Sequence, residues 1–551
     1  MIPAGKASAF LAALFLLLGA QAVQASGLID NVNGLTVDAK GNLVHFTGLV
    51  IDDEGRVEKR LSRRDSRPER PAFRYDGKGR TLIPGLIDAH GHLIDLGFSR
   101  LNLDLSDTAS LEEAKQKIAA FASANPGRPW IIGFGWNHDK WDLGRFPTAA
   151  DLDGLAQGRP IWLGGIDGHA GWANEAALAA AKITSATKPP TGGRIEMIGG
   201  KPAGVLVDKA MDLMTPALPR PQPKDYDAAF AAAQDALLAQ GVTAIADMGT
   251  SIEHWQAYRR AGDRGALRIR IMAYARGPEQ AALIAGPAPT PWLYDDRLRL
   301  GGVKLTADGA LGSRGAWLKA PYADAPKESG LPLLTSAQLR NQMSRAAMDG
   351  FQLAVHAIGD RANADVLDAI DELSHTYKGD RRWRIEHAQI VDAADLPRFS
   401  QHGIIASMQP QHATSDWAMA TRRLGPDRLG GAYAWRTMLD NKVPLAFGSD
   451  APVAPADPFA GLTAAVSGPN DSAGVPERRV TLIEALRAYT WGAAFAGFAE
   501  ERFGNLAPGQ RADFLILDRD IELVRPAELP ATEILEVWVG GRRMTMKEGA
   551  P

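Results

Sequence analysis

The sequence predicts an α/β fold: a (β/α)8 barrel, or TIM barrel, with a small β-sandwich domain built from both chain ends and a long insertion after barrel strand 1. Three observations lead to this prediction. Eight short apolar segments recur, many ending in a polar residue and followed by stretches with helical spacing. The interval from His92 to Asp247 is far longer than one barrel unit needs. Short strands separated by turns occur near both ends of the chain and nowhere between.

The eight apolar segments are the expected barrel strands. They are Thr81–His90, Gly241–Asp247, Arg268–Ala275, Leu300–Asp308, Gln352–His356, Trp383–His387, Gly403–Gln409 and Val443–Asp450. Their last residues are often His, Asp, Lys or Gln, while their bodies stay apolar. Because the carboxyl ends of barrel strands meet at one face, these polar side chains are expected to converge on a single mouth.

The chain therefore divides into three predicted parts. Residues 81–504 are assigned to the barrel, with an insertion subdomain at about 95–235, and residues 26–80 and 505–551 to the composite β-sandwich. The insertion contains an aromatic stretch over Gly133–Trp141. Its Trp136, His138 and Trp141 are expected either to line a substrate pocket or to form a packed turn.

The first 25 residues are predicted to be a signal peptide. Lys6 precedes the apolar run Ala9–Ala20, and small residues lead up to Ala25, the order typical of a secretory signal. As a helix the apolar run would reach only about 18 Å, short of the roughly 30 Å of a bilayer core. The sequence thus predicts a periplasmic or secreted protein without a membrane span.

Composition excludes several classes of function. The chain has 61 Lys and Arg against 64 Asp and Glu, a net charge of −3, so it offers no reason to expect nucleic acid as a partner. It has no Cys, which excludes disulfides, a Cys nucleophile and Cys-held metals. The expected partner is a small-molecule substrate, and a homo-oligomer is left open.

Five residues at strand ends predict a metal site. His90 and His92 flank a glycine at one strand end, where period-two alternation directs both rings to the same face. His356 and His387 end two later strands, and Asp450 ends the last. Packing alone seldom gathers four histidines and a carboxylate at barrel strand ends, so we expect them to bind metal.

These motifs resemble the metal-dependent amidohydrolase superfamily. The resemblance rests on residues 84–92 (PGLIDAHGH), His356, Glu386-His387 and Gly448-Ser449-Asp450. The runs Asp308–Arg314 (DGALGSR), His356–Arg361 (HAIGDR) and Gln409–His412 (QPQH) are similar to its third family, which includes N-substituted formamide deformylase. Ala310 and Gly315 depart from that family's pattern, which often has Ser and Thr there.

The resemblance implies a ligand set. His90, His92 and Asp450 would bind one divalent cation and His356 and His387 a second, with Zn expected at both sites and Mn or Fe as alternatives. Lys304 would bridge them as an N-carboxylated side chain, since a lysine ammonium has no lone pair for a metal. The alternative is an unmodified Lys304 paired with Asp308 or Asp450.

The expected reaction is hydrolysis of a C–N bond, in an amide or cyclic amide other than an ordinary peptide, by a metal-activated hydroxide. Asp450 would act as general base and then general acid. His169 and Arg314 would hold the carbonyl oxygen or a substrate carboxylate. Two other functions stay open: a single-metal hydrolytic deaminase, for which Asp360 follows His356 at a suitable spacing, and a non-enzymatic exported binding protein.

Overall fold

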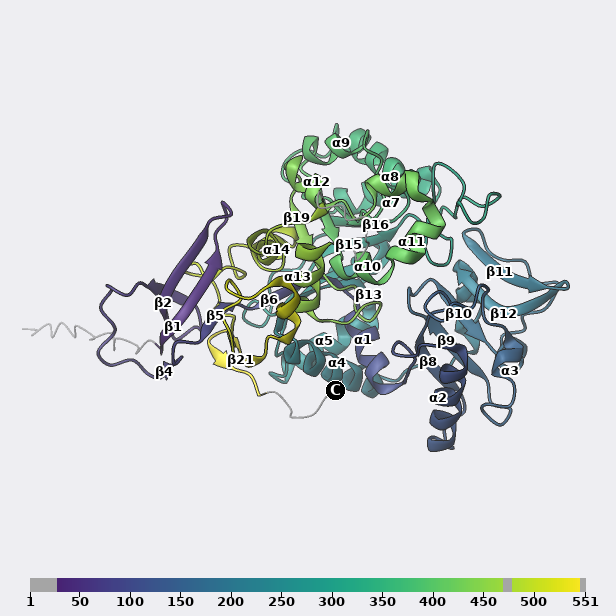
Figure 1. Cartoon of the computed structure of the whole chain (residues 1–551), viewed down its shortest axis with the longest axis horizontal. Coiled ribbons are helices and arrows are strands. Elements are labelled where there is room, and N and C mark those ends of the chain that lie inside the picture. Colours follow the sequence, from purple (N-terminus) through teal and green to yellow (C-terminus); the bar gives the residue numbers. More distant parts are fainter. Residues whose placement is uncertain (1–26, 469–477, 546–551) are drawn as a thin grey trace, which may run out of the picture.

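The structure, a computed structural model, describes residues 27–468 and 478–545. Three sheets lie side by side: a sheet built from the chain ends, a central barrel and the sheet of the insertion (Figure 1). The predicted signal peptide, residues 1–25, lies outside the described residues. Among the residues that are described, no helix is both long and apolar enough to cross a bilayer.

The central sheet confirms the predicted barrel. Its strands are β6 (Leu86–Gly91), β13 (Val242–Thr250), β14 (Arg270–Arg276), β15 (Leu298–Thr306), β16 (Gln352–Ala357), β17 (Arg384–His387), β18 (Ile405–Met408) and β19 (Leu445–Phe447). They are parallel and neighbours in chain order. Beyond β19 the barrel closes on β6, where the Asp450 amide donates to the His90 carbonyl at 2.7 Å.

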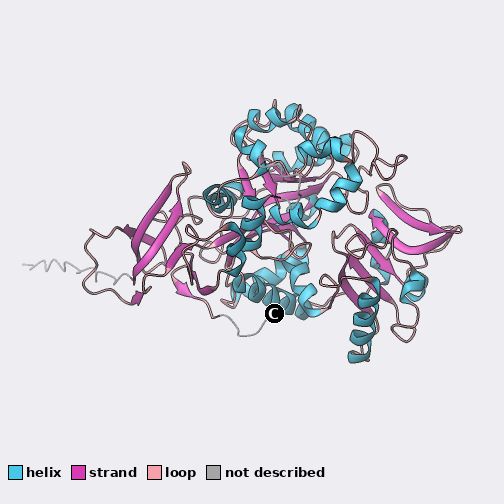
Figure 2. Ribbon diagram, in the orientation of Figure 1, coloured by secondary structure: helices cyan, strands magenta, loops and turns pink. Residues whose placement is uncertain are grey.

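Helices cover the outside of the barrel and extend its loops (Figure 2). They are α1 (Leu93–Leu101), α4 (Pro223–Ala239), α5 (Ile252–Asp263), α6 (Gly277–Ala285), α7 (Ser336–Met348), α8 (Asp360–Leu373), α9 (Leu396–Gln401), α10 (Pro410–Ser415), α11 (Trp417–Leu424), α12 (Trp435–Asp440), α13 (Pro458–Ser467), α14 (Leu482–Ala488) and α15 (Trp491–Ala496). Several begin at side-chain caps; the Thr335 hydroxyl, for example, accepts from the Gln338 amide ahead of α7.

The segment predicted as the first barrel strand, Thr81–His90, divides into two strands. β5 (Thr81–Pro84) pairs with the chain-end sheet, and β6 begins the barrel. The break falls at Gly85, where an added Cβ would lie 2.2 Å from the Thr243 hydroxyl. The amide of Gly85 donates to Asp513, whereas that of Leu86 donates to Gly241, so the chain changes hydrogen-bonding partners at this residue.

Both chain ends contribute to one domain, as the fold class predicts; the sequence predicts a small β-sandwich, and the described strands form one eight-stranded sheet. It contains β1 (Gly27–Val37), β2 (Leu43–Ile51), β3 (Val57–Leu61), β4 (Arg74–Asp76), β5, β20 (Phe514–Leu517), β21 (Ile534–Val539) and β22 (Arg542–Arg543). β5 lies between β1 and β20 and joins the two ends. Ile29 and Leu82 share an apolar core with Phe514 and Trp538.

The insertion forms a six-stranded sheet of its own. It contains β7 (Leu103–Asp104), β8 (Ile131–Trp136), β9 (Ile161–Gly165), β10 (Ala170–Ala173), β11 (Gly193–Ile198) and β12 (Lys201–Asp208), with α2 (Leu111–Ala124) and α3 (Glu175–Ala180). Short 3-10 turns are η1 (Ala149–Leu152), η2 (Lys209–Leu213) and η3 (Thr215–Ala217) here, and η4 (Pro426–Gly431) and η6 (Pro526–Ala531) elsewhere. The chain leaves the barrel through α1 and returns through α4, and these helices pack together.

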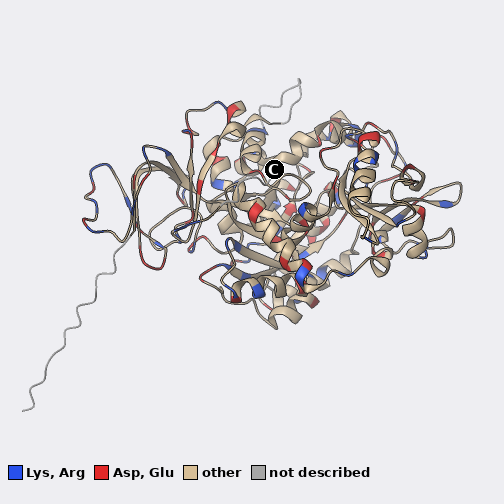
Figure 3. Cartoon of the chain, turned by 90° about the horizontal axis from the view of Figure 1, so that it is seen from below, with Lys and Arg blue, Asp and Glu red and all other residues tan. Residues whose placement is uncertain are grey.

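Polar contacts join the insertion to barrel loops. Arg423 donates to Asp139 at 2.9 Å, and Lys209 donates to the Leu333 carbonyl. Arg194 donates to the Ser313 carbonyl at 3.1 Å. Basic and acidic residues are interspersed through the chain in the view of Figure 3, as the small net charge suggests. The insertion thus lies against the loops that follow the barrel strands.

Trp136 belongs to the core of the insertion. Its side chain is 2% exposed, packs with Trp141 and Trp172, and donates from Nε1 to the Leu163 carbonyl at 2.8 Å. Of the two interpretations that the sequence allowed for the aromatic stretch, these contacts support the packed turn.

We expect Trp136→Ala to destabilise the insertion by about 3–5 kcal/mol, because it removes a large buried side chain and leaves a cavity. The control is Ile198→Ala, since Ile198 on the same sheet is 63% exposed. Thermal unfolding, together with limited proteolysis of the insertion, measures the stability of both variants. Equal melting curves for the two variants would contradict the assignment of Trp136 to the core.

Candidate metal centre

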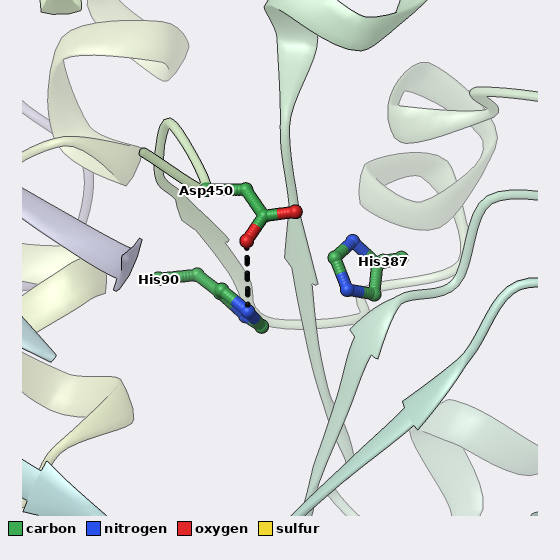
Figure 4. A group of neighbouring side chains, drawn as sticks. All are labelled: His90, His387 and Asp450. Atoms are coloured by element: carbon green, nitrogen blue, oxygen red, sulfur yellow. Dashed lines mark ion pairs between the residues drawn. The ribbon is translucent and has the colours of Figure 1, made fainter. Parts of the chain in front are cut away.

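Three side chains meet at the mouth of the barrel. His90, His387 and Asp450 each present a ligand atom, and these atoms all lie within 4.8 Å of one another (Figure 4). His90 comes from β6 and His387 from the end of β17, while Asp450 follows β19. Residues far apart in the sequence are thus brought together by the convergence of strand ends.

The backbone turns sharply where two of these residues lie. His387 has φ of 72° and Asp450 has φ of 62°, in the left-handed region that few non-glycine residues adopt. Such conformations cost energy and often occur where a side chain must be directed into a functional site. At His387 the turn interrupts the period-two alternation of β17.

The other predicted ligands surround this group. His92 Nε2 lies 3.1 Å from an Asp450 carboxylate oxygen, and Lys304 Nζ lies 3.2 Å from His90 Nε2. The ring of His356 is 4.5 Å from that of His387 between centroids. All six predicted metal residues therefore lie in one connected cluster.

Burial determines the charge of the cluster. It lowers the pKa of His90 to about 4, with the Lys304 charge adding to the effect, and it lowers the pKa of His356 and His387 well below the usual range. Burial opposes ionisation of Asp450, but His90 and His92 nearby hold its pKa well below the ordinary value. Neutral imidazoles and an ionised carboxylate are the forms that bind metal.

The donor set fits a divalent cation. The buried His356 Nε2 and Asp450 Oδ1 have no hydrogen-bond partner among the described residues, although buried polar atoms are nearly always paired. His387 Nδ1 lies 2.8 Å from the Gln409 side-chain oxygen, which leaves its Nε2 for a ligand bond. Imidazole and carboxylate together suit zinc and similar first-row metals.

A buried ion pair lies behind His90. Glu386 Oε2 is 2.6 Å from His90 Nδ1, and Arg384 donates to both oxygens of the same carboxylate. All three side chains are fully buried. Arg384 also donates to the Tyr274 and Ser407 hydroxyls. This network fixes the His90 ring with Nε2 directed at the centre, an arrangement that raises the basicity of a ligand histidine.

We expect Glu386→Gln to lower metal affinity by about 10- to 100-fold, since an amide of the same shape no longer supplies the negative charge behind His90. Competition with a chelator measures the affinity. Glu501→Gln is the matched control, because Glu501 is exposed. Unchanged affinity in a folded Glu386→Gln protein would contradict the role of Glu386.

A buried acid, Asp308, and a histidine from the insertion border the cluster on the His356 side. Asp308 is fully buried, accepts from the Ile358, Gly359 and Trp317 amides, and lies 3.5 Å from His356 Nε2. Burial raises the pKa of Asp308 to about 7. His169, from the insertion, places its ring 5.2 Å from that of His356. The predicted proximity of His169 to the metal residues is thus present.

Three other residues named from the sequence have different surroundings. Arg314 is ion-paired with Asp324 at 2.8 Å, so its predicted contact with substrate stays a prediction. Asp360 begins α8 and accepts from the Lys319 amide at 2.8 Å. His412 is buried, and its ring is stacked 6.2 Å from that of His387.

The residues that hold the ligands in place have no role that the sequence alone predicts. Asp88 accepts from the His90 and Ser449 amides and thereby links β6 to the loop of Asp450. Glu386 and Asp88 are both part of the motifs that carry the resemblance. Their position one or two residues from a ligand histidine was the available signal.

Comparison with known proteins decides the family. Residues 75–544 match the Amidohydrolase family. The chain belongs to that family. It is 35% identical to Protein LONG AFTER FAR-RED 3 of Arabidopsis thaliana, over 85% of this chain and 82% of the plant protein. It is 28% identical to N-substituted formamide deformylase of Arthrobacter pascens, over 93% and 97% of the two chains.

Solved structures agree with this assignment. The amidohydrolase is similar to an uncharacterised metal-dependent hydrolase from Pyrococcus horikoshii, with 28% identity, a TM-score of 0.73, and coverage of 91% of this chain and 99% of the other. Family and structural likeness together support a metal-dependent hydrolase and confirm the resemblance inferred from the motifs.

Proposed function

We propose that this amidohydrolase cleaves a C–N bond of a small molecule, in an amide or cyclic amide other than an ordinary peptide. The observation that carries the proposal is the cluster of His90, His92, Lys304, His356, His387 and Asp450 at the mouth of the barrel. Among the relatives, one is named for deformylation of N-substituted formamides, which makes formamides the first substrates to test.

We assign the ligands as the family resemblance implies. His90, His92 and Asp450 would hold one zinc and His356 and His387 a second, with a carboxylated Lys304 between them. When bound, such cations lower the pKa of water and polarise a carbonyl group. The alternatives are a single metal, or manganese or iron in place of zinc.

Side chains of this protein would transfer the protons and bind the substrate. Asp450 would take the proton of the attacking water on a carboxylate oxygen and give it to the leaving nitrogen. His169 would donate to the substrate carbonyl oxygen; burial lowers its pKa, but Asp208 raises it to about 9, so the imidazolium is present at neutral pH. For Arg314 to bind a substrate carboxylate, its pair with Asp324 would have to open.

The deaminase alternative receives no support from Asp360, whose carboxylate caps the Lys319 amide. We also propose that the protein is exported, on the basis of the signal peptide that the sequence predicts in residues 1–25. Separation of periplasmic and cytoplasmic fractions, with N-terminal sequencing of the mature chain, tests export.

The function is tested with protein stripped by a chelator and reloaded with zinc, manganese or iron. A panel of N-substituted formamides, N-acyl amino acids, cyclic amides, aryl esters and aminated heterocycles is then screened. We expect metal-dependent release of amine and carboxylate from an amide. Ammonia release from aminated heterocycles alone would contradict the proposal and favour a deaminase, and protein that retains no metal would favour a binding protein.

A further inference from the structure

The insertion contributes a carboxylate behind His169, Asp208, to which the proposed function gives no positioning role. Asp208 ends β12, and its Oδ1 lies 2.7 Å from His169 Nδ1. His169 directly precedes β10, which pairs antiparallel with β12, and the Asp208 amide donates to the His169 carbonyl at 2.8 Å. Both backbone and side-chain contacts therefore hold this pair together.

Asp208 is held in an energetically unfavourable setting. Its side chain is buried, and its second oxygen, Oδ2, has no hydrogen-bond partner among the described residues. Its φ of 51° lies in the left-handed region, which is uncommon for residues other than glycine. A buried carboxylate oxygen without a partner at a strained position calls for a functional reason.

The barrel loop after β15 is shaped to receive this carboxylate. A Cβ on Gly309 would lie 2.6 Å from Asp208 Oδ2, and a Cβ on Gly315 would lie at the same distance. Any side chain at either position would therefore displace the Asp208 carboxylate. Neither glycine has a positive φ, so the close approach, and not the backbone conformation, is what requires glycine there.

The His169 ring is consequently fixed in one orientation. With Nδ1 directed at Asp208, Nε2 is the nitrogen left for another partner, and it makes no hydrogen bond within the described part of the chain. The ring lies beside that of His356, one of the proposed ligands. A histidine held through Nδ1 by a carboxylate is a common way of orienting Nε2 toward a reacting group.

We propose that Asp208 is a positioning residue that holds His169 Nε2 toward the substrate at the metal centre. Gly309 and Gly315 assist, because the absence of a Cβ at both leaves room for the Asp208 carboxylate. The insertion then completes the active site: it provides His169 and Asp208, while the barrel provides the metal ligands. This inference rests on the proposed function, because it assumes that His169 contacts the substrate.

Two variants test the inference. Asp208→Asn keeps the size of the side chain and removes its charge, and Gly315→Ala leaves Asp208 in the sequence but displaces its carboxylate. Asp212→Asn is the matched control, since Asp212 lies in the adjacent turn η2 and is exposed. All four proteins are prepared as full chains loaded with zinc, and their metal content is measured first.

The readout that a merely structural role would not change is the state of the His169 ring. Proton–nitrogen correlation spectra with labelled histidine, assigned through a His169→Gln protein, report for each ring nitrogen whether it carries a proton and how fast that proton exchanges. We expect an Nδ1 proton protected from exchange in wild type and in Asp212→Asn. In the two variants that protection should be lost, and kcat should fall at least tenfold with metal content unchanged and a smaller effect on KM.

Unchanged His169 signals and kcat in both Asp208→Asn and Gly315→Ala would overturn the inference. If either variant fails to fold, the other decides, because they alter different chain segments. Failure of this inference can be distinguished from failure of the proposed function. If the proposed function is wrong, the zinc-loaded wild type shows no hydrolytic activity. If this inference is wrong, the His169 signals show it, and they are recorded without substrate.

Discussion

Asp450→Asn should lower kcat by about 10²-fold or more while leaving the fold intact, because asparagine keeps the shape of the side chain and loses the proton acceptor. Asp450 is buried, and its carboxylate lies within 3.4 Å of His90 Nε2 and 3.1 Å of His92 Nε2. These neighbours keep it ionised, so that it can accept a proton from water at neutral pH.

The same carboxylate is a proposed metal ligand, so the experiment must separate two effects. Metal content is measured for every preparation, and kcat is calculated per bound metal at saturating zinc. Asp427→Asn is the control, because Asp427 is exposed in the turn η4. A normal kcat in metal-loaded Asp450→Asn would remove Asp450 from the proton transfer.

The barrel was predictable from sequence because its strands have a simple pattern. Each has an apolar body, as in β16, and several end in a residue such as His356 that must face the mouth. Parallel strands converge at that end, so a metal site of four histidines and Asp450 followed from strand position, whereas Lys304 as a ligand was implied only by the family resemblance. The convergence of His90 and His387 therefore needed no knowledge of loop structure, whereas Asp450 lies in the loop that follows β19.

Other features depended on contacts between distant segments. The break at Gly85 arises from the approach of Thr243, which alternation of apolar residues does not reveal. Asp208 is brought to His169 by strand pairing within the insertion, and its approach to Gly315 depends on how the insertion lies against the barrel. These are tertiary contacts, for which one sequence offers no local signal.

The second large effect is expected at Lys304, which we predict to be an N-carboxylated metal bridge. Lys304 lies in β15, is 7% exposed, and has its Nζ 3.2 Å from His90 Nε2. Burial lowers its pKa to about 8, so a substantial fraction of the amine is uncharged at mildly alkaline pH. An uncharged amine can attack carbon dioxide, forming an N–C bond and losing a proton to give a carbamate.

Lys304→Ala should therefore lose metal together with activity, with kcat lower by about 10²-fold, since two cations would lack the anionic oxygens between them. A short carboxylic acid in solution, such as acetate, should restore part of both by occupying the vacated position. Lys327→Ala, at an exposed site, is the control for loss of a lysine. Metal analysis with and without acetate gives the comparison.

The decisive observation is electron density at the Lys304 nitrogen in crystals of metal-loaded, active protein, because a carbamate can be lost during mass spectrometry. Density for a carboxyl group between two cations would establish the bridge. A bare ammonium in fully loaded, active protein would refute it. Lys304 would then be a charged neighbour of His90 and Asp450, and the reaction would have to proceed with a single metal held by the remaining histidines and Asp450.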